Sequence, residues 1–209
     1  MPADWNIEFW PQCSRYVFLS HCEEDRRRLV GPVHDALETR GCNTWIDERH
    51  YPVGRDAFET LRDKILECRH VVYFVTSSFL GQGRGWTGIE RAYSALLQQN
   101  LRYGPSEISH VELPLFFLPP NHVQLARSAW GSVVGTGRGA FYRPGRVDGG
   151  AVDWAIHEIL RFIRQEEQYS AEIADRIDRD SRLREHVTSD LNLRDRILAM
   201  SPPPLPLSR

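Results

Sequence analysis

Short apolar runs rich in β-forming residues alternate with amphipathic segments along most of this 209-residue chain, and this alternation constrains the fold more than any other feature. The run at residues 71–76, VVYFVT, is apolar almost throughout. Such a run is typical of a parallel strand that helices cover on both faces, so we place it at the centre of a sheet. The other expected strands lie, in chain order, at residues 16–20, 42–47, 113–118 and, with a weaker pattern, 132–134.

Apolar residues at helical spacing mark the segments between these strands. The first helix is expected at residues 25–40, and Gly41 follows it where a left-handed cap would end a helix. A D-x-x-E capping box formed by Asp56 and Glu59 opens the second helix. Two further helices are expected at residues 89–97 and 152–163.

This order of elements predicts an α/β fold class. Alternation with short connections favours a flavodoxin-like five-stranded parallel sheet in the order 2-1-3-4-5, with helices on both faces. In such sheets ligands bind beyond the carboxyl ends of the strands, next to the switch between strands 1 and 3. Three loops are therefore expected to line a site, at residues 20–25, 47–54 and 77–86.

The pattern changes beyond residue 168. Apolar residues at 169–200 are spread among dense alternating charges, which predicts a charged, helical C-terminal extension and a candidate surface for a protein partner. Residues 201–209, SPPPLPLSR, favour an extended or disordered tail. With a lead-in at residues 1–14, the sheet domain is expected to span residues 15–168.

Composition and charge exclude several classes of partner. A formal net charge of −2 gives no cationic field for nucleic acid or an anionic membrane surface. No segment approaches the roughly 18 apolar residues of a membrane span, and the first ten residues lack the apolar stretch of a signal peptide. The four cysteines have no paired spacing, so we expect reduced thiols and no metal site. These features favour a cytoplasmic protein.

The first two loops carry groups that can bind a ribose or a phosphate. Ser20 and His21 offer a hydroxyl and an imidazole at the end of strand 1. A purely structural role for Ser20, as a cap of its loop, fits the sequence equally well. The arginines at 26–28 fit a solvated helix face better. Asp47 ends strand 2 and Tyr51 follows it in the loop; hydrogen bonding of Asp47 to loop amides is the alternative for that carboxylate.

The third loop leads to a tryptophan and a glutamate at helical spacing. Trp86 and Glu90 are four residues apart, so a helix would place them on one face, one turn from each other. Glu90 falls beside the expected core-facing stripe, where burial could desolvate its carboxylate. A surface glutamate paired with a nearby arginine is the ordinary alternative. Ser77 and Ser78 begin the loop and complete the candidate set.

Three segments together resemble the TIR (Toll/interleukin-1 receptor) domain family. Residues 16–21, YVFLSH, resemble its first box, and residues 46–54, IDERHYPVG, resemble its BB loop. Residues 77–90, SSFLGQGRGWTGIE, resemble the Ser…W-x-x-x-E segment of TIR domains that consume NAD. The chain departs from that pattern at Thr87, where the family usually has cysteine, and in a glycine-rich insert at residues 81–85.

The resemblance implies a function and its residues. Glu90 would be catalytic, and Trp86 would be the tryptophan of W-x-x-x-E. With the groups that the three loops carry, the expected substrate-binding set is Ser20, His21, Asp47, Tyr51, Ser77, Ser78 and Trp86. The substrate would be NAD+, cleaved to nicotinamide and ADP-ribose or a cyclic isomer, with no separate cofactor. Self-association through the loop at residues 50–54 would activate the enzyme, and the expected setting is prokaryotic immune signalling such as anti-phage defence.

Two alternatives remain open. A non-catalytic adaptor would act by TIR to TIR interaction alone, although the spacing of Trp86 and Glu90 argues against it. An enzyme resembling nucleoside deoxyribosyltransferases would use a similar sheet and a glutamate but would prefer deoxynucleosides.

Overall fold

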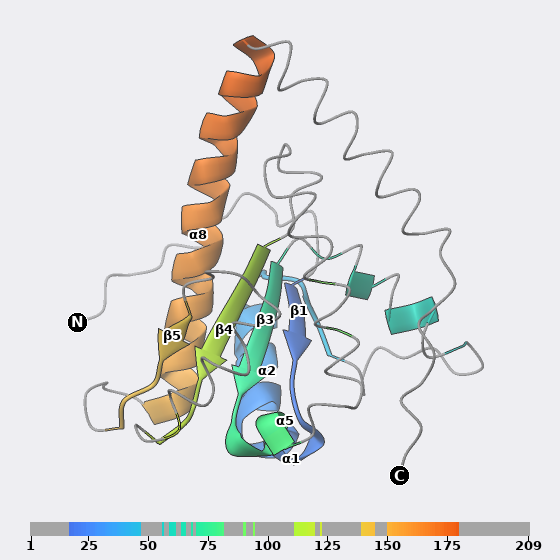
Figure 1. Cartoon of the computed structure of the whole chain (residues 1–209), viewed down its shortest axis with the longest axis vertical. Helices are drawn as coiled ribbons and strands as arrows, with labels where there is room; N and C mark the ends of the chain where they lie inside the picture. Colours follow the sequence, from blue (N-terminus) through green and yellow to red (C-terminus); the bar gives the residue numbers. More distant parts are fainter. Residues whose placement is uncertain are drawn as a thin grey trace.

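The described part of the chain forms a five-stranded parallel sheet with helices packed against it (Figure 1). The structure is a computed structural model of the whole chain. It describes residues 17–46, 56, 59–61, 64–65, 68, 70–81, 90, 94, 111–119, 122, 139–144 and 150–179.

The sheet has the predicted strand order. Its strands are β1 (Val17–Ser20), β2 (Thr44–Trp45), β3 (His70–Val75), β4 (Val111–Phe116) and β5 (Ala140–Phe141). They pair in the order β2-β1-β3-β4-β5, and every pair is parallel. The expected doubly wound topology is therefore confirmed, with the switch point between β1 and β3.

Helices lie between the strands and after the last one, but α5 forms where the sequence predicted the start of the third loop, at residues 77–81. The helices expected from Asp56 and at residues 89–97 lie largely outside the described residues. The described helices are α1 (Glu23–Asp25), the π-helical turn η2 (Arg26–Val30), α2 (Gly31–Thr39), α5 (Ser77–Gly81) and the 30-residue α8 (Gly150–Arg179). None of the helices within the described ranges is long and apolar enough to cross a membrane.

Helix α2 ends at the expected glycine. Gly41 has a φ of 76°. Its N–H donates to the Glu38 carbonyl at 2.9 Å, and the Cys42 N–H donates to the Leu37 carbonyl at 3.0 Å. These two bonds form a Schellman cap, which satisfies carbonyls that the helix leaves without a partner. The cap turns the chain directly into β2.

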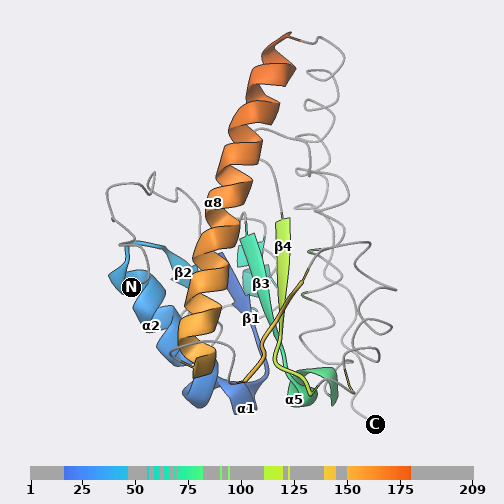
Figure 2. The ribbon, with the colours of Figure 1, turned by 90° about the vertical axis from the view of Figure 1, so that its left-hand side faces the viewer.

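Two apolar layers hold the sheet. Figure 2 shows α2 and α8 on one side of it. There Val33 and Leu37 of α2 pack with Ile159 and Ile163 of α8 in one buried cluster. A second buried cluster, on the opposite face, contains residues Phe18, Trp45, Leu61, Ile65, Tyr73, Phe79 and Phe116. Both faces are thus covered, as the apolar character of β3 predicts.

The first helix is less regular than expected. Residues 25–40 were expected to form one α-helix, but η2 interrupts it with a π-helical turn. Pro32 has no N–H to donate to the carbonyl of Arg28, so the regular hydrogen-bond series cannot continue there. Such turns widen a helix locally, and this one follows directly on α1.

The fifth strand was placed incorrectly. It lies at Ala140–Phe141, whereas the expected segment 132–134 lies outside the described residues. Phe141 stacks on Phe116 of β4 with ring centroids 4.5 Å apart. At Gly139 a Cβ atom would lie 2.3 Å from Phe116 Cε2, so only glycine permits this approach. Local β-propensity carries no information about such a fit.

Helix α8 extends beyond the expected end of the last helix. It runs without a break from Gly150 to Arg179, whereas the periodic pattern predicted residues 152–163. The boundary at residue 168 therefore lies inside one helix. The division into a sheet domain and an extension stays a prediction, and residues 180–209 lie outside the described part of the chain.

Candidate active site

The predicted site residues that the structure describes lie at or beside the carboxyl edge of β1 and β3. Ser20 is the last residue of β1, and its register partner is Tyr73 of β3. Helices α1 and α5 begin just beyond these two strands and lie at the same end of the sheet (Figure 1). This edge is where doubly wound sheets bind their ligands.

Ser20 and Glu90 are in direct contact. The Ser20 hydroxyl donates a hydrogen bond to Glu90 Oε2 across 70 residues of sequence. Both residues are buried, with Ser20 1% and Glu90 6% exposed. The structure thus brings two of the predicted residues together. It also removes the Glu90 carboxylate from bulk water, as expected for a glutamate beside the core and not for one on the surface.

His21 is held by contacts at both of its ring nitrogens. Nδ1 lies 2.9 Å from the Leu19 carbonyl oxygen, and Arg26 Nε donates to His21 Nε2 at 3.3 Å. A guanidinium only donates and a carbonyl only accepts, so the ring hydrogen lies on Nδ1. His21 therefore links β1 to the start of η2, and its contact with a substrate stays a prediction.

A second link joins α1 to the residue between β3 and α5. Thr76 Oγ1 donates to Asp25 Oδ2 at 2.6 Å and accepts a bond from the Phe79 amide at 3.1 Å. Thr76 is thus the N-cap of α5. The pKa of Asp25 is raised, first by burial and further by Glu24, whereas the Thr76 bond and His21 oppose the rise.

Asp25 and Thr76 were not among the predicted site residues. The signal for Thr76 was a hydroxyl residue immediately after an apolar strand, which is a frequent helix N-cap. Nothing in the sequence singled out Asp25 from its acidic neighbours, because its partner is 51 residues away.

The remaining predicted residues divide into two groups. Ser77 and Ser78 are the first residues of α5; Ser77 is exposed and Ser78 is half-buried at the same edge. Asp47, Tyr51 and Trp86 lie outside the described residues.

A buried phenol lies next to this site. Tyr73 is fully buried, and its hydroxyl donates to Glu112 Oε1 of β4 at 3.1 Å. Its pKa is raised well above the ordinary value by burial, then by the charge of Glu112 and more weakly by that of Glu90, while a hydrogen bond with Ser94 opposes the rise. The sequence signal was a single acid inside the apolar strand VELPLF.

The arrangement suits the stabilisation of positive charge. A buried carboxylate acts more strongly on a nearby cation than an exposed one, because little water screens it. Glu90 can also accept hydrogen bonds from sugar hydroxyls. Cys22, by contrast, is buried and burial raises the pKa of its thiol, so it is a poor nucleophile.

Comparisons with known proteins agree with this fold. A family model described as TIR domain matches residues 17–124, more than half of the chain. NAD(+) hydrolase TirS from Staphylococcus aureus (strain MSSA476) is 31% identical over 74 residues, which are 35% of this chain and 26% of that protein. The match thus spans about a quarter of that relative's length.

A solved structure shows the same fold. The TIR domains in a structure of the activated Roq1 resistosome directly recognizing the pathogen effector XopQ align with a TM-score of 0.54. The alignment covers 72% of this chain and 99% of that one at 20% identity. At that identity the likeness shows the fold alone.

Proposed function

Since this chain belongs to the TIR domain family, we propose that it cleaves the bond between nicotinamide and ribose in NAD+, with Glu90 as the catalytic residue. The observation that carries the proposal is the buried hydrogen bond from Ser20 to Glu90 at the carboxyl edge of the sheet. The similarity to a relative named as an NAD(+) hydrolase supports the choice of substrate.

A single carboxylate suffices for this chemistry. The nicotinamide of NAD+ is cationic and leaves as a neutral molecule, so the leaving group needs no proton from an acid. The oxocarbenium-like transition state gains positive charge on the ribose, which a fixed carboxylate stabilises. The Ser20 hydroxyl fixes the orientation of Glu90, so little reorganisation is needed when that charge develops.

We propose that the other predicted site residues bind the substrate beside Glu90. Ser77 and Ser78 offer hydroxyls at the start of α5, and His21 keeps the end of β1 in place. We propose Asp47, Tyr51 and Trp86 as the remaining members, with an aromatic ring of Tyr51 or Trp86 stacking on a ring of the substrate. Water capture of the ribose cation would give ADP-ribose, and an internal nucleophile would give a cyclic isomer.

The proposal includes activation by assembly. We propose that copies associate through the loop at residues 50–54, that residues 169–200 bind a protein partner, and that the protein acts in cytoplasmic immune signalling. The TIR domains of the solved resistosome structure support an assembled state.

Nicotinamide release from NAD+ at high protein concentration tests the proposal. Glu90→Gln should lower the rate on the order of a hundredfold or more, as loss of a preorganised charge does. Glu158→Gln is a matched control, since Glu158 lies on α8 and pairs with the exposed Arg161. Equal release by the wild type and Glu90→Gln would remove Glu90 from the mechanism.

The adaptor hypothesis remains the second candidate because the structural relative is an assembly. It predicts association without turnover. An assembled wild-type protein that releases no nicotinamide, and whose association is lost on substitution in the loop at residues 50–54, would favour the adaptor.

A further inference from the structure

A buried polar network lies behind Glu90, and the chemistry proposed above does not use it. Ser20 and Tyr73 are register partners on the parallel strands β1 and β3. Register partners on neighbouring strands point to the same face of a sheet, so the two side chains lie side by side. Each bonds to a residue that is helical: Ser20 to Glu90 and Tyr73 to Ser94.

Two sheet residues thus bond to two residues one helical turn apart. Glu90 and Ser94 are both helical, and a spacing of four places them on one face. Ser20 bonds to Glu90, and Tyr73 bonds to Ser94. Ser94 is 0% exposed, so its bond to the phenol lies in the core. This pair of links fixes Glu90 and Ser94 relative to the strand ends.

Glu112 determines which way the Tyr73 hydroxyl is directed. A phenol has one hydrogen, and Tyr73 donates it to Glu112 Oε1 at 3.1 Å. The phenol oxygen is then left to accept a hydrogen bond from the Ser94 hydroxyl. The pKa of Tyr73 is raised well above its ordinary value by burial and by Glu112, so the phenol keeps its hydrogen at neutral pH.

Apolar side chains at positions 73 and 112 would cost less free energy to bury. Glu112 is 6% exposed in a strand that is otherwise apolar, and removing a carboxyl group from water costs free energy even when it is hydrogen-bonded. Phenylalanine and leucine would fill much the same space without that cost. A polar pair retained here points to a requirement for defined geometry.

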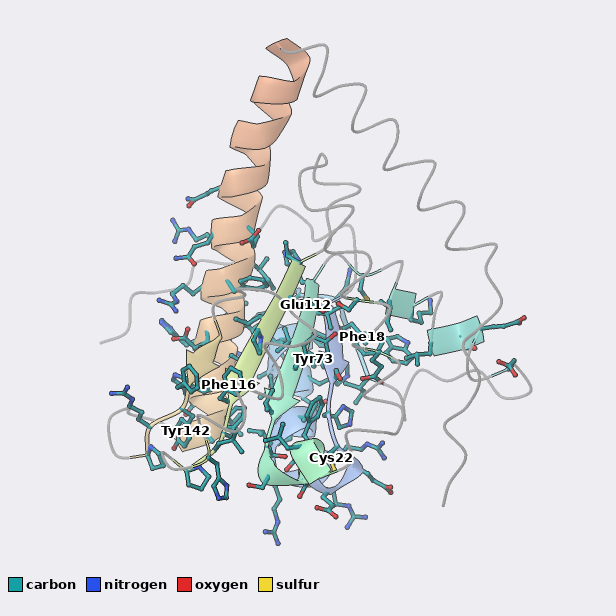
Figure 3. The ribbon with its side chains drawn as sticks, in the orientation of Figure 1. Phe18, Cys22, Tyr73, Glu112, Phe116 and Tyr142 are labelled. Atoms are coloured by element: carbon teal, nitrogen blue, oxygen red, sulfur yellow. The ribbon has the colours of Figure 1, made fainter. Side chains whose placement is uncertain are left out.

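We propose that Tyr73 and Glu112 are positioning residues for Glu90, which hold the helical turn containing Glu90 and Ser94 against the end of β1 through the Ser94 hydroxyl. The proposal rests on the proposed function for its catalytic consequence, whereas the positioning itself is a property of the fold. Figure 3 shows Tyr73 and Glu112 on the neighbouring strands β3 and β4.

The experiment compares Tyr73→Phe, Glu112→Leu and Glu112→Gln with the wild type. One readout is hydrogen exchange of the backbone amides in the peptide that contains Glu90 and Ser94. The other is kcat and KM for nicotinamide release. Tyr142→Phe is the matched control, because Tyr142 packs on Phe117 and Trp154 in the other apolar layer (Figure 3).

Tyr73→Phe and Glu112→Leu should speed exchange of that peptide about tenfold and lower kcat about tenfold, with KM within about twofold of the wild type. Glu112→Gln should recover most of the loss caused by Glu112→Leu, since its amide oxygen still accepts the phenol hydrogen. Tyr142→Phe should behave as the wild type.

The proposal would be overturned if Tyr73→Phe had the same peptide exchange rate and the same kcat as the wild type. It would also be overturned if Glu112→Gln recovered none of the kcat lost in Glu112→Leu, or if the variants changed KM and left kcat unchanged. A wild type that releases no nicotinamide would refute the proposed function instead, and the exchange of the peptide would then decide the positioning on its own.

Discussion

Thr76 donates a hydrogen bond of 2.6 Å to Asp25 and accepts one of 3.1 Å from the Phe79 amide, so one hydroxyl joins the end of α1 to the first turn of α5. Both helices lie at the carboxyl edge of the sheet, beside the candidate site. Loss of this hydroxyl should therefore loosen the carboxyl edge of the sheet without removing apolar contacts.

Thr76→Val should lower the free energy of unfolding by about 1–2 kcal/mol, because it removes an N-cap and a hydrogen bond to a carboxylate. Urea unfolding measures the change, and Thr76→Ser should restore most of it. Thr39→Val is the control: the Thr39 hydroxyl bonds to the Asp35 carbonyl on the exposed side of α2, and its loss should cost less than about 0.5 kcal/mol. Equal losses at both positions would contradict the bridging role.

Asp25 should make stability depend on pH in the direction opposite to that of most acids. Its pKa is raised above the ordinary value of 3.8, chiefly by burial, so the folded state binds the proton more tightly than the unfolded chain does. Its contribution is therefore fully present below the unfolded-state pKa and is lost as the pH rises through the folded-state pKa.

Asp25→Asn removes this titration. The stability of the asparagine variant relative to the wild type should increase as the pH rises from below 3.8 to neutrality, because only the wild type acquires a partly buried charge. Urea unfolding of both proteins across that range gives the difference, in which the other titrating groups cancel. A difference that is constant with pH would show that burial does not raise the pKa of Asp25.

Gly139 should tolerate no side chain. A Cβ atom there would lie 2.3 Å from Phe116 Cε2 and 2.8 Å from the Pro114 carbonyl oxygen, so β5 would have to move away from β4. Gly139→Ala should cost about 1–3 kcal/mol, as overpacking does. Thermal unfolding checks this against Gly81→Ala, where a Cβ meets nothing within 4 Å and the change should be neutral or stabilising. A neutral Gly139→Ala would mean that β5 is not held by this close approach.

The fold could be predicted because its signals are local. Apolar runs, helical spacing and a glycine cap each depend on residues close in sequence, and together they gave the strand order. The position of β5 was missed because it depends on how Phe141 and Gly139 fit Phe116, more than 20 residues away in sequence. A two-residue strand has no period of its own to detect.

The candidate site could be predicted only as a set of separate residues. Ser20 and Glu90 were each singled out, but their contact spans 70 residues and depends on the packed fold. Tyr73 and Glu112 were missed because each sits inside a strand that otherwise has the composition of core. A buried hydrogen bond between two strands leaves no periodic pattern in sequence.

The contact between Ser20 and Glu90 can be tested through stability alone, without any assumption about NAD+. Ser20→Ala leaves a buried carboxylate with one donor fewer, and a hydrogen bond to a charged group contributes about 1.5–3 kcal/mol. In the Glu90→Ala background the same substitution should cost much less, since the acceptor is absent. A double-mutant cycle in urea should therefore give a coupling energy of about 1 kcal/mol or more. Additive losses would mean that the two side chains do not interact in solution, and Glu90 would then lack the fixed orientation on which its proposed role depends.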